Sequence, residues 1–352
     1  MFEKEKTELA ENGMYLRNYS DKKRNNKELV MIAVRQNGCV LEFASDDLRD
    51  DKGVVIEAVR ECGYALRYAS PKLRNDRNVV FEAINQNAYA LEYASDALKG
   101  DKDIVLTAVR QNGLTLDYAS DRLKSNKTVI LEAVRQDGLA LGYANFELRA
   151  DKNVVLEAVG ENGFALKYAD SKLRGDKEVL LKAVNETGYA LEYATDELKN
   201  DKDIVLEAVC QRGRALEYAS PKLKDDVDVV LEAIRQDGEA LEFASPKMRD
   251  NKDVVLKAVE QNGLALDYAS RGLKGDKDVV LAAVKQNGRA LRFTNIELRG
   301  DRDIVLAAAN QDIEALRYAV YSKDGNIALE DAILKDAALK DVILNAVEKL
   351  YS

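Results

Sequence analysis

The chain has 352 residues, of which 46% are hydrophobic and 33% charged, so it can bury a substantial core. Its formal net charge of -9 argues against duplex nucleic acid as a partner, because phosphate binding needs positive charge. It has no histidine, the commonest general base and metal ligand near neutral pH, and no tryptophan, a favoured anchor of protein interfaces.

The N-terminal segment MFEKEKTELAENG has no apolar core of signal-peptide length. No run of the chain approaches the ~18 apolar residues of a membrane span. The cysteines, Cys39, Cys62 and Cys210, are odd in number and form no CxxC motif. This pattern predicts that there is no disulfide framework and indicates a reducing, cytoplasmic compartment.

A single period of 25 residues then runs through the chain. Glycine recurs from Gly13 to Gly288, with Ala88 and Ile313 as the exceptions in that slot, and leucine recurs from Leu16 to Leu316 without a break. A fixed short period is typical of a solenoid, in which each repeat buries its apolar face on its neighbours. The chain is therefore predicted to be all-α, an α-solenoid of about twelve 25-residue repeats.

Residues 101–125, DKDIVLTAVRQNGLTLDYASDRLKS, represent the repeat unit. Asp101 is the predicted N-cap of a helix that ends near Gly113, and this glycine is expected to supply a left-handed residue. A second, short segment covers 114–119, and Ser120 caps a third segment of one turn. Twenty-five residues cannot hold two long helices, so each repeat is predicted to contain one α-helix and two short α or 3₁₀ turns.

The apolar residues of the first helix cover most of its circumference. They are Ile104, Val105, Leu106, Ala108 and Val109. Such a helix is expected to be buried on more than one side, as an inner helix of a stack must be.

Both ends of the chain depart from the repeat pattern. Residues 1–20 predict an N-terminal capping half-repeat, 21–320 the tandem repeat solenoid, and 321–352 a C-terminal helical cap. Terminal units of this kind shield the open faces of a repeat array from water.

The repeated pattern LKxDKxVVLxAVxQNGxALxYAS resembles a bacterial tandem repeat family known only as a domain of unknown function. The resemblance covers about residues 8 to 320. It implies a helical array and a host-interaction setting, because such arrays are often found in proteins of intracellular bacteria and sometimes beside effector domains. In that setting the protein is expected to act inside a host cell as an effector-type binding module. It brings no catalytic residues to this chain.

The residue after the repeated glycine differs from repeat to repeat, and its identity bears on function. This slot is occupied in chain order by Cys39, Tyr64, Tyr89, Leu114, Leu139, Phe164, Tyr189, Arg214, Glu239, Leu264, Arg289 and Glu314, which we call the post-glycine row. One interpretation is an apolar docking stripe for a protein partner, formed by Tyr64, Tyr89, Leu114, Leu139, Phe164 and Tyr189. The alternative is local packing on the preceding helical turn. The charged residues later in the row indicate that the slot tolerates solvent.

Two further slots are basic. The slot after Leu123 is Lys or Arg in every repeat, from Arg24 to Arg299, and the slot after the Asp or Asn cap is basic except at Val227. These cations could bind an anionic surface or a polyanion. The alternative, which we favour, is that they pair with nearby acids such as Asp50, Asp51 and Asp103.

A Gln or Glu near the end of each first helix, from Gln36 to Gln311, forms a ladder and not a cluster. Hydrogen bonds to the backbone of the next repeat explain it better than catalysis does. Active sites are singular, whereas nearly every polar feature here recurs about twelve times, so we predict no catalytic, cofactor-binding or metal-binding residues. A reactive thiol at Cys62 or Cys210 stays open.

The sequence as a whole predicts a non-catalytic scaffold that binds a protein partner. The alternative function is binding of anionic surfaces or polyanions through the Lys and Arg slots.

Overall fold

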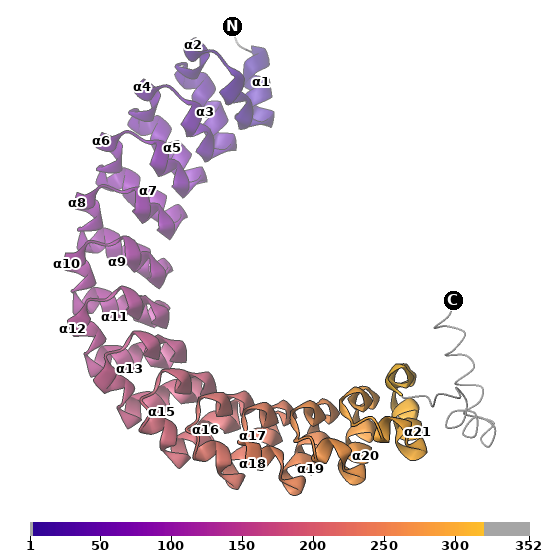
Figure 1. Cartoon of the computed structure of the whole chain (residues 1–352). Coiled ribbons are helices and arrows are strands. Elements are labelled where there is room, and N and C mark those ends of the chain that lie inside the picture. Colours follow the sequence, from indigo (N-terminus) through magenta and orange to yellow (C-terminus); the bar gives the residue numbers. More distant parts are fainter. Residues whose placement is uncertain (1–2, 320–352) are drawn as a thin grey trace. The chain divides into compact units, whose positions relative to one another are not determined.

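The computed structural model describes residues 3–319, and these residues form helices and turns without a β-strand. Each repeat contains a long α-helix, a six-residue 3₁₀ helix and a final short turn (Figure 1). In the repeat at 101–125 these are α9 (Lys102–Gln111), η5 (Gly113–Tyr118) and α10 (Asp121–Lys124). The predicted all-α repeat architecture is confirmed.

The long helices are α1 (Glu3–Glu11), α3 (Lys27–Gln36), α5 (Lys52–Glu61), α7 (Arg77–Gln86), α9, α11 (Lys127–Gln136), α13 (Lys152–Glu161), α15 (Lys177–Glu186), α16 (Lys202–Gln211), α17 (Val227–Gln236), α19 (Lys252–Gln261), α20 (Lys277–Gln286) and α21 (Arg302–Gln311).

The six-residue 3₁₀ helices are η1 (Gly13–Asn18), η2 (Gly38–Phe43), η3 (Gly63–Tyr68), η4 (Ala88–Tyr93), η5, η6 (Gly138–Tyr143), η7 (Gly163–Tyr168), η8 (Gly188–Tyr193), η10 (Gly213–Tyr218), η12 (Gly238–Phe243), η13 (Gly263–Tyr268), η15 (Gly288–Phe293) and η17 (Ile313–Tyr318).

The final turns are α2 (Asp21–Arg24), α4 (Asp46–Arg49), α6 (Pro71–Arg74), α8 (Asp96–Lys99), α10, α12 (Phe146–Arg149), α14 (Ser171–Arg174) and α18 (Pro246–Arg249), with 3₁₀ geometry in η9 (Leu198–Asn200), η11 (Leu223–Asp225), η14 (Leu273–Gly275) and η16 (Leu298–Gly300).

Side-chain caps begin the helices. The Asp101 carboxylate accepts hydrogen bonds from the backbone N–H groups of Asp103 and Ile104, as predicted for an N-cap. A second cap, which the sequence analysis did not identify, begins the 3₁₀ helix: Asn112 Oδ1 accepts from Leu114 N–H at 3.0 Å. The residue before the glycine therefore ends one helix and starts the next.

The expected left-handed conformation of Gly113 is wrong, because none of the repeated glycines has a positive φ. The glycine is needed instead because the backbone of the following repeat approaches it closely. A Cβ atom at Gly238 would lie 2.7 Å from the carbonyl oxygen of Ala258 in the following repeat, and the same contact recurs at nine other glycines of this slot. A side chain in this slot would push neighbouring repeats apart.

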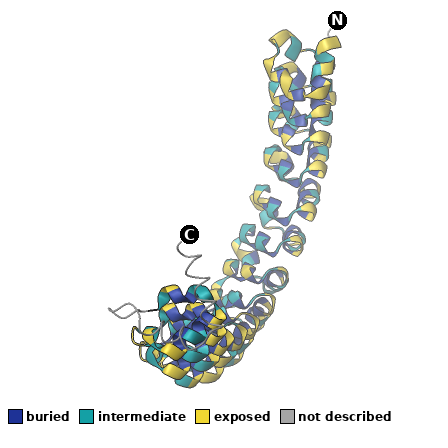
Figure 2. Cartoon of the chain, turned by 90° about the vertical axis from the view of Figure 1, so that its right-hand side faces the viewer, coloured by how far each residue is buried: buried dark blue, intermediate teal, exposed yellow. Residues whose placement is uncertain are grey.

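The core includes four slots of the long helix, two leucines of the later segments and the small residue before the first of these leucines. In α9 the four are Ile104, Val105, Ala108 and Val109, all fully buried, and the two leucines are Leu116 and Leu123. Figure 2 shows the buried residues where neighbouring repeats face one another and the exposed residues along the outer edges. Each repeat therefore contributes to a core that it shares with the repeats before and after it.

The chain divides into two compact units, Met1–Lys182 and Ala183–Ser352, with the boundary inside α15. At the N-terminus, α1 has the place of a long helix but buries only Leu9. The capping role of residues 1–20 stays a prediction. The C-terminal cap predicted at 321–352 lies outside the described residues.

Candidate docking surface

The post-glycine row remains at the surface. In the first unit Tyr64 and Phe164 are exposed, at 39% and 37%, and Leu114 and Leu139 are half-buried. In the second unit Tyr189 is half-buried and borders a hollow with Gln211, Arg214 and Gln236. None of these side chains is part of the buried core.

The tyrosines of the row also pack on the next repeat. The ring of Tyr64 meets that of Tyr93 edge to face at 6.1 Å between centroids, and Tyr89 meets Tyr118 at 6.4 Å. Asn112 Nδ2 donates a hydrogen bond to the Tyr89 hydroxyl at 3.1 Å. One part of each ring is thus held by the array, and the other part faces solvent.

A second apolar row lies on the long helices. We call it the long-helix row: Met31, Ile56, Phe81, Leu106, Leu131 and Leu156 in the first unit, Leu181 at the boundary, and Leu206, Leu231, Leu256, Leu281 and Leu306 in the second. These residues are partly exposed, and Phe81 reaches 44%. The expectation that the long helix is buried around most of its circumference is therefore wrong at Leu106.

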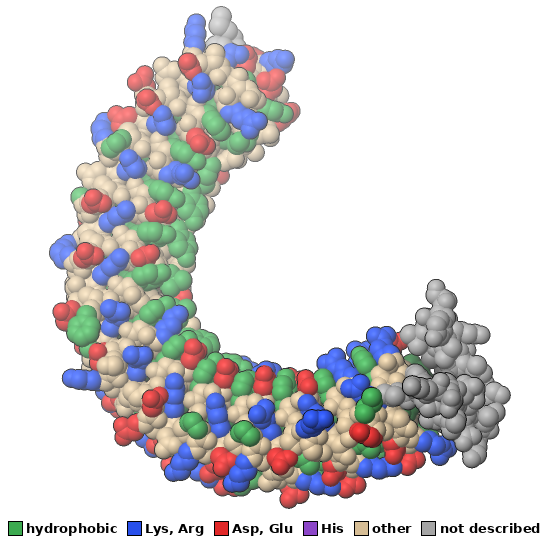
Figure 3. All heavy atoms as spheres, viewed as in Figure 1, with side chains coloured by type: hydrophobic (Ala, Val, Ile, Leu, Met, Phe, Trp, Pro, Cys, Tyr) green, Lys and Arg blue, Asp and Glu red, His purple; other side chains and the backbone are tan. Residues whose placement is uncertain are grey.

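The helical period explains this exposure. At 100° per residue, Leu106 lies roughly 130° from the middle of the arc formed by the four buried slots of α9. This angle could have been calculated from the sequence once the buried slots were chosen. Figure 3 shows hydrophobic side chains gathered over the long helices along one edge of the first unit.

Ion pairs between successive long helices flank this row. Arg35 pairs with Glu57 at 2.9 Å, and the equivalent pairs Arg60–Glu82, Arg110–Glu132 and Arg135–Glu157 measure 2.9, 2.6 and 2.6 Å. The basic residue comes four positions after the member of the row, so it lies on the same helix face. The row is thus bordered by charges that neutralise each other.

In the second unit the row borders an open groove. Leu231, Ile234 and Arg235 of α17 line it together with Lys257, Glu260 and Gln261 of α19. Its volume is about 470 Å³, and apolar atoms make up most of its wall. A groove of this kind can receive an apolar side chain of a partner.

The basic slot after the Asp cap is largely paired. Eight of its side chains form an ion pair with the cap of the next repeat: Lys27–Asp51, Lys52–Asp76, Arg77–Asp101, Lys127–Asp151, Lys152–Asp176, Lys202–Asp226, Lys252–Asp276 and Lys277–Asp301. Val227, the exception, precedes a repeat whose cap is the neutral Asn251. This pairing supports the favoured interpretation, in which the cations of this slot form ion pairs with nearby acids of the array.

The ladder of Gln side chains joins neighbouring repeats, also as expected, but toward the preceding repeat. Gln86 Oε1 accepts from Gly63 N–H at 2.6 Å, and its Nε2 donates to the Glu61 carbonyl at 3.3 Å. Five other glycines donate to a Gln in the same way. Each Gln satisfies a part-buried backbone N–H that lies just after a helix end.

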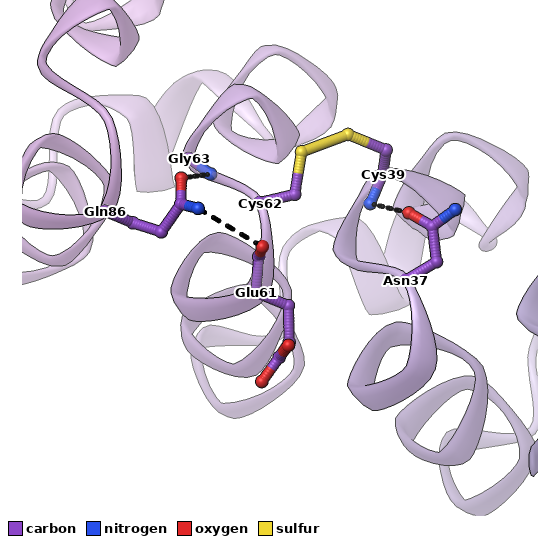
Figure 4. The surroundings of a disulfide bond; sticks show 6 residues. All are labelled: Asn37, Cys39, Glu61, Cys62, Gly63 and Gln86. Atoms are coloured by element: carbon purple, nitrogen blue, oxygen red, sulfur yellow. Dashed lines mark hydrogen bonds between the residues drawn. A yellow bond between two sulfur atoms is a disulfide. The ribbon is translucent and has the colours of Figure 1, made fainter.

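The expectation of no disulfide is wrong at one pair, because the structure joins Cys39 to Cys62 (Figure 4). Their Cα atoms lie 5.9 Å apart, within the usual range for a disulfide. Stacking of the repeats brings the slot after one glycine beside the slot before the next, and the cysteines occupy these two slots. Cys210 is free and exposed.

Residues 3–319 contain no group of three or more Cys, Asp or Glu side chains placed to hold a metal ion. None of their helices is long and apolar enough to cross a membrane.

The repeated helices, the shared core and the repeated surface rows define an all-α tandem-repeat protein. The chain belongs to the family described as the domain of unknown function DUF4116, which matches it seven times, at 9–49, 51–99, 101–149, 151–199, 176–224, 226–274 and 276–319. Most matches span two of the 25-residue repeats, in agreement with the suspected family. No curated protein matches the sequence.

Proposed function

We propose that the protein is a non-catalytic scaffold that binds a protein partner along its apolar rows. One observation carries this proposal: large apolar side chains recur at positions that the packed array leaves partly exposed. Isolated exposed apolar residues need no explanation, but rows of them are typical of interaction surfaces. The docking residues proposed for the post-glycine row are Tyr64, Tyr89, Leu114, Leu139, Phe164 and Tyr189.

The structure adds the long-helix row to this proposal. Phe81 is more exposed than any member of the post-glycine row in the first unit, and it replaces the aliphatic residue found in the other repeats. Aromatic side chains are favoured anchors of protein interfaces. A partner that lies across several long helices would contact one member of the row in each repeat.

The setting in which the scaffold acts is proposed from the family resemblance alone. In this setting the protein is located in the bacterial cytoplasm and is delivered into a host cell, where it acts as an effector-type binding module.

Binding assays with two matched sets of variants test the proposal. The first set is Tyr64→Glu, Tyr89→Glu and Leu114→Glu, and the second is Phe81→Glu, Leu106→Glu and Leu131→Glu. The natural residues Glu239 and Glu314 indicate that the post-glycine slot accepts a carboxylate without loss of fold. Circular dichroism checks that each variant is folded before its captured partners are compared with those of the wild type.

Loss of a partner by one folded set assigns docking to that row. If both folded sets retain every partner, the rows serve only packing and the proposal is wrong. Binding that weakens steeply with salt and survives both sets of substitutions would instead support the anionic-surface alternative.

A further inference from the structure

Cys39 and Cys62 occupy two slots that face each other at the boundaries between repeats. The residue after one glycine and the residue before the next are 23 positions apart, and their side chains also meet elsewhere. Asn262 Nδ2 donates to Glu239 Oε1 at 3.1 Å, and Arg289 Nε donates to Asp312 Oδ2 at 2.8 Å. The stacking therefore presents this pair of slots at successive boundaries, and at one of them both residues are thiols.

The packing around the two cysteines does not depend on the sulfur–sulfur bond. Cys39 N–H donates to Asn37 Oδ1 at 3.0 Å, as the post-glycine residue does in other repeats. Across the boundary that the disulfide crosses, Lys27 pairs with Asp51 at 2.6 Å and Arg35 pairs with Glu57 at 2.9 Å. The next boundary is held by Gln86, which binds backbone atoms of Gly63 and Glu61 (Figure 4). None of these contacts involves sulfur, and the same two ion pairs recur between α11 and α13, where there is no cysteine, so the dithiol form is expected to stay folded.

The position of Cys62 is otherwise unfavourable for a cysteine. Most repeats have Asn or Asp there, and its side chain accepts from the N–H of the post-glycine residue. Cys62 makes no such hydrogen bond to Tyr64. Both cysteines are half-buried, so part of each side chain is at the surface, where a small thiol can reach it.

We propose that Cys39 and Cys62 are a reversible redox site that exchanges with a low-molecular-weight thiol–disulfide couple of the glutathione class. On oxidation, one cysteine thiolate attacks glutathione disulfide, forms a mixed disulfide and releases one glutathione thiolate. The second cysteine thiolate then attacks the protein-bound sulfur and displaces the other glutathione. The protein loses two electrons to glutathione disulfide, and the two protons of the cysteines pass to the two glutathione thiolates. Reduction is the reverse.

The oxidised form links the first turn of η2 to Cys62, the residue that precedes η3 and lies two residues before Tyr64. Cys39 itself is the first member of the post-glycine row. Oxidation therefore restrains the N-terminal end of that row, whereas reduction leaves this boundary like the others. The redox chemistry does not depend on the row being a docking surface.

Titration of the full chain with mixtures of reduced and oxidised glutathione tests the proposal. After an acid quench, free thiols are alkylated, and the protein is examined by intact mass and peptide mapping. Cys39 and Cys62 are expected to lose their thiols together and to appear in one linked peptide pair, while Cys210 does not join them. The single variants Cys39→Ser and Cys62→Ser are expected to accumulate mixed disulfides with glutathione instead. A Cys210→Ser background excludes disulfides formed through that exposed thiol.

A transplanted pair supplies the matched control. In a chain with Cys39→Ser and Cys62→Ser, the substitutions Leu114→Cys and Asp137→Cys recreate the same two slots at another boundary. This pair is expected to oxidise like the natural one. The offset pair Leu114→Cys with Asn162→Cys spans two boundaries and is expected to yield only mixed disulfides.

Two results would overturn the proposal. One is a wild-type chain that forms only mixed disulfides at Cys39 and Cys62. The other is loss of helical circular dichroism upon reduction, since the fold would then require the disulfide and the bond would not be a reversible site. Retained helicity with joint oxidation of the pair establishes it.

Discussion

At the residue scale, the repeated glycine is required by the backbone of another repeat and not by its own conformation. Gly238 donates its N–H to Gln261 Oε1 at 2.7 Å and lies against the carbonyl of Ala258. Its absent side chain is what allows both contacts. Ala88 shows that a methyl group is accommodated at one boundary, where it is almost fully buried.

We expect Gly238→Ala to lower the free energy of unfolding by about 1–3 kcal/mol, because the added methyl overpacks the boundary. Urea unfolding followed by circular dichroism measures the change. Gly238→Asn distinguishes the two explanations for the glycine. Asn tolerates left-handed backbone better than Ala does, so a milder effect of Asn than of Ala would contradict the close-approach explanation.

At the element scale, eight of the Asp N-caps each bind two repeats. The Asp151 carboxylate accepts from the N–H groups of Asn153 and Val154 in its own helix and pairs with Lys127 of the preceding repeat. An amide can also cap the helix: Asn251 accepts from two backbone N–H groups, and Asn26 and Asn126 accept from one each. Replacing Asp by Asn therefore removes the ion pair while it preserves the cap.

This leads to a prediction about pH. Hydrogen bonds from Lys27, Lys127 and Lys152 hold the pKa of Asp51, Asp151 and Asp176 below its usual value. Their contribution to stability is therefore complete above the unfolded-state pKa of about 3.9 and is lost as the pH falls through the lower folded-state pKa. Exposed pairs of this kind contribute roughly 0.2–1 kcal/mol each.

The triple variant Asp51→Asn, Asp151→Asn, Asp176→Asn should be less stable than the wild type at pH 7, and the difference should shrink as the pH falls below the unfolded-state pKa of about 3.9. Urea midpoints at several pH values provide the measurement. A difference that stays constant over this pH range would show that the ion pairs do not cause it.

At the scale of the whole molecule, each repeat contacts mainly its neighbours, so a local defect should remain local. We expect Gly238→Ala to speed amide hydrogen exchange in α17 and α19, which meet at this boundary. Exchange in α3, α5 and α7 of the first unit should match the wild type. Hydrogen exchange followed by mass spectrometry tests this, and faster exchange throughout the first unit would indicate long-range cooperativity.

The same dependence on neighbours separates what the sequence could predict from what it could not. The period, the Asp101 cap and the three segments of each repeat follow from local rules, and the structure confirms them. The role of Gly113, the exposure of Leu106 and the bond between Cys39 and Cys62 depend on how one repeat lies on the next. The sequence of a single repeat does not determine which of its residues contact the next repeat, so these features became visible only in the stacked array. The docking role of the post-glycine row stays a prediction.

Because neighbouring repeats meet through the same slots throughout each unit, removal of one stretch of 25 residues would rejoin surfaces that already fit. Unequal recombination between copies of the coding repeat would therefore change the length of the array in whole steps without the need for a new boundary. The overlapping matches 151–199 and 176–224 are offset by one repeat, which fits an array that has grown by single repeats as well as by pairs. Cys39 and Cys62 would be the exception, since an insertion between them would separate the two thiols.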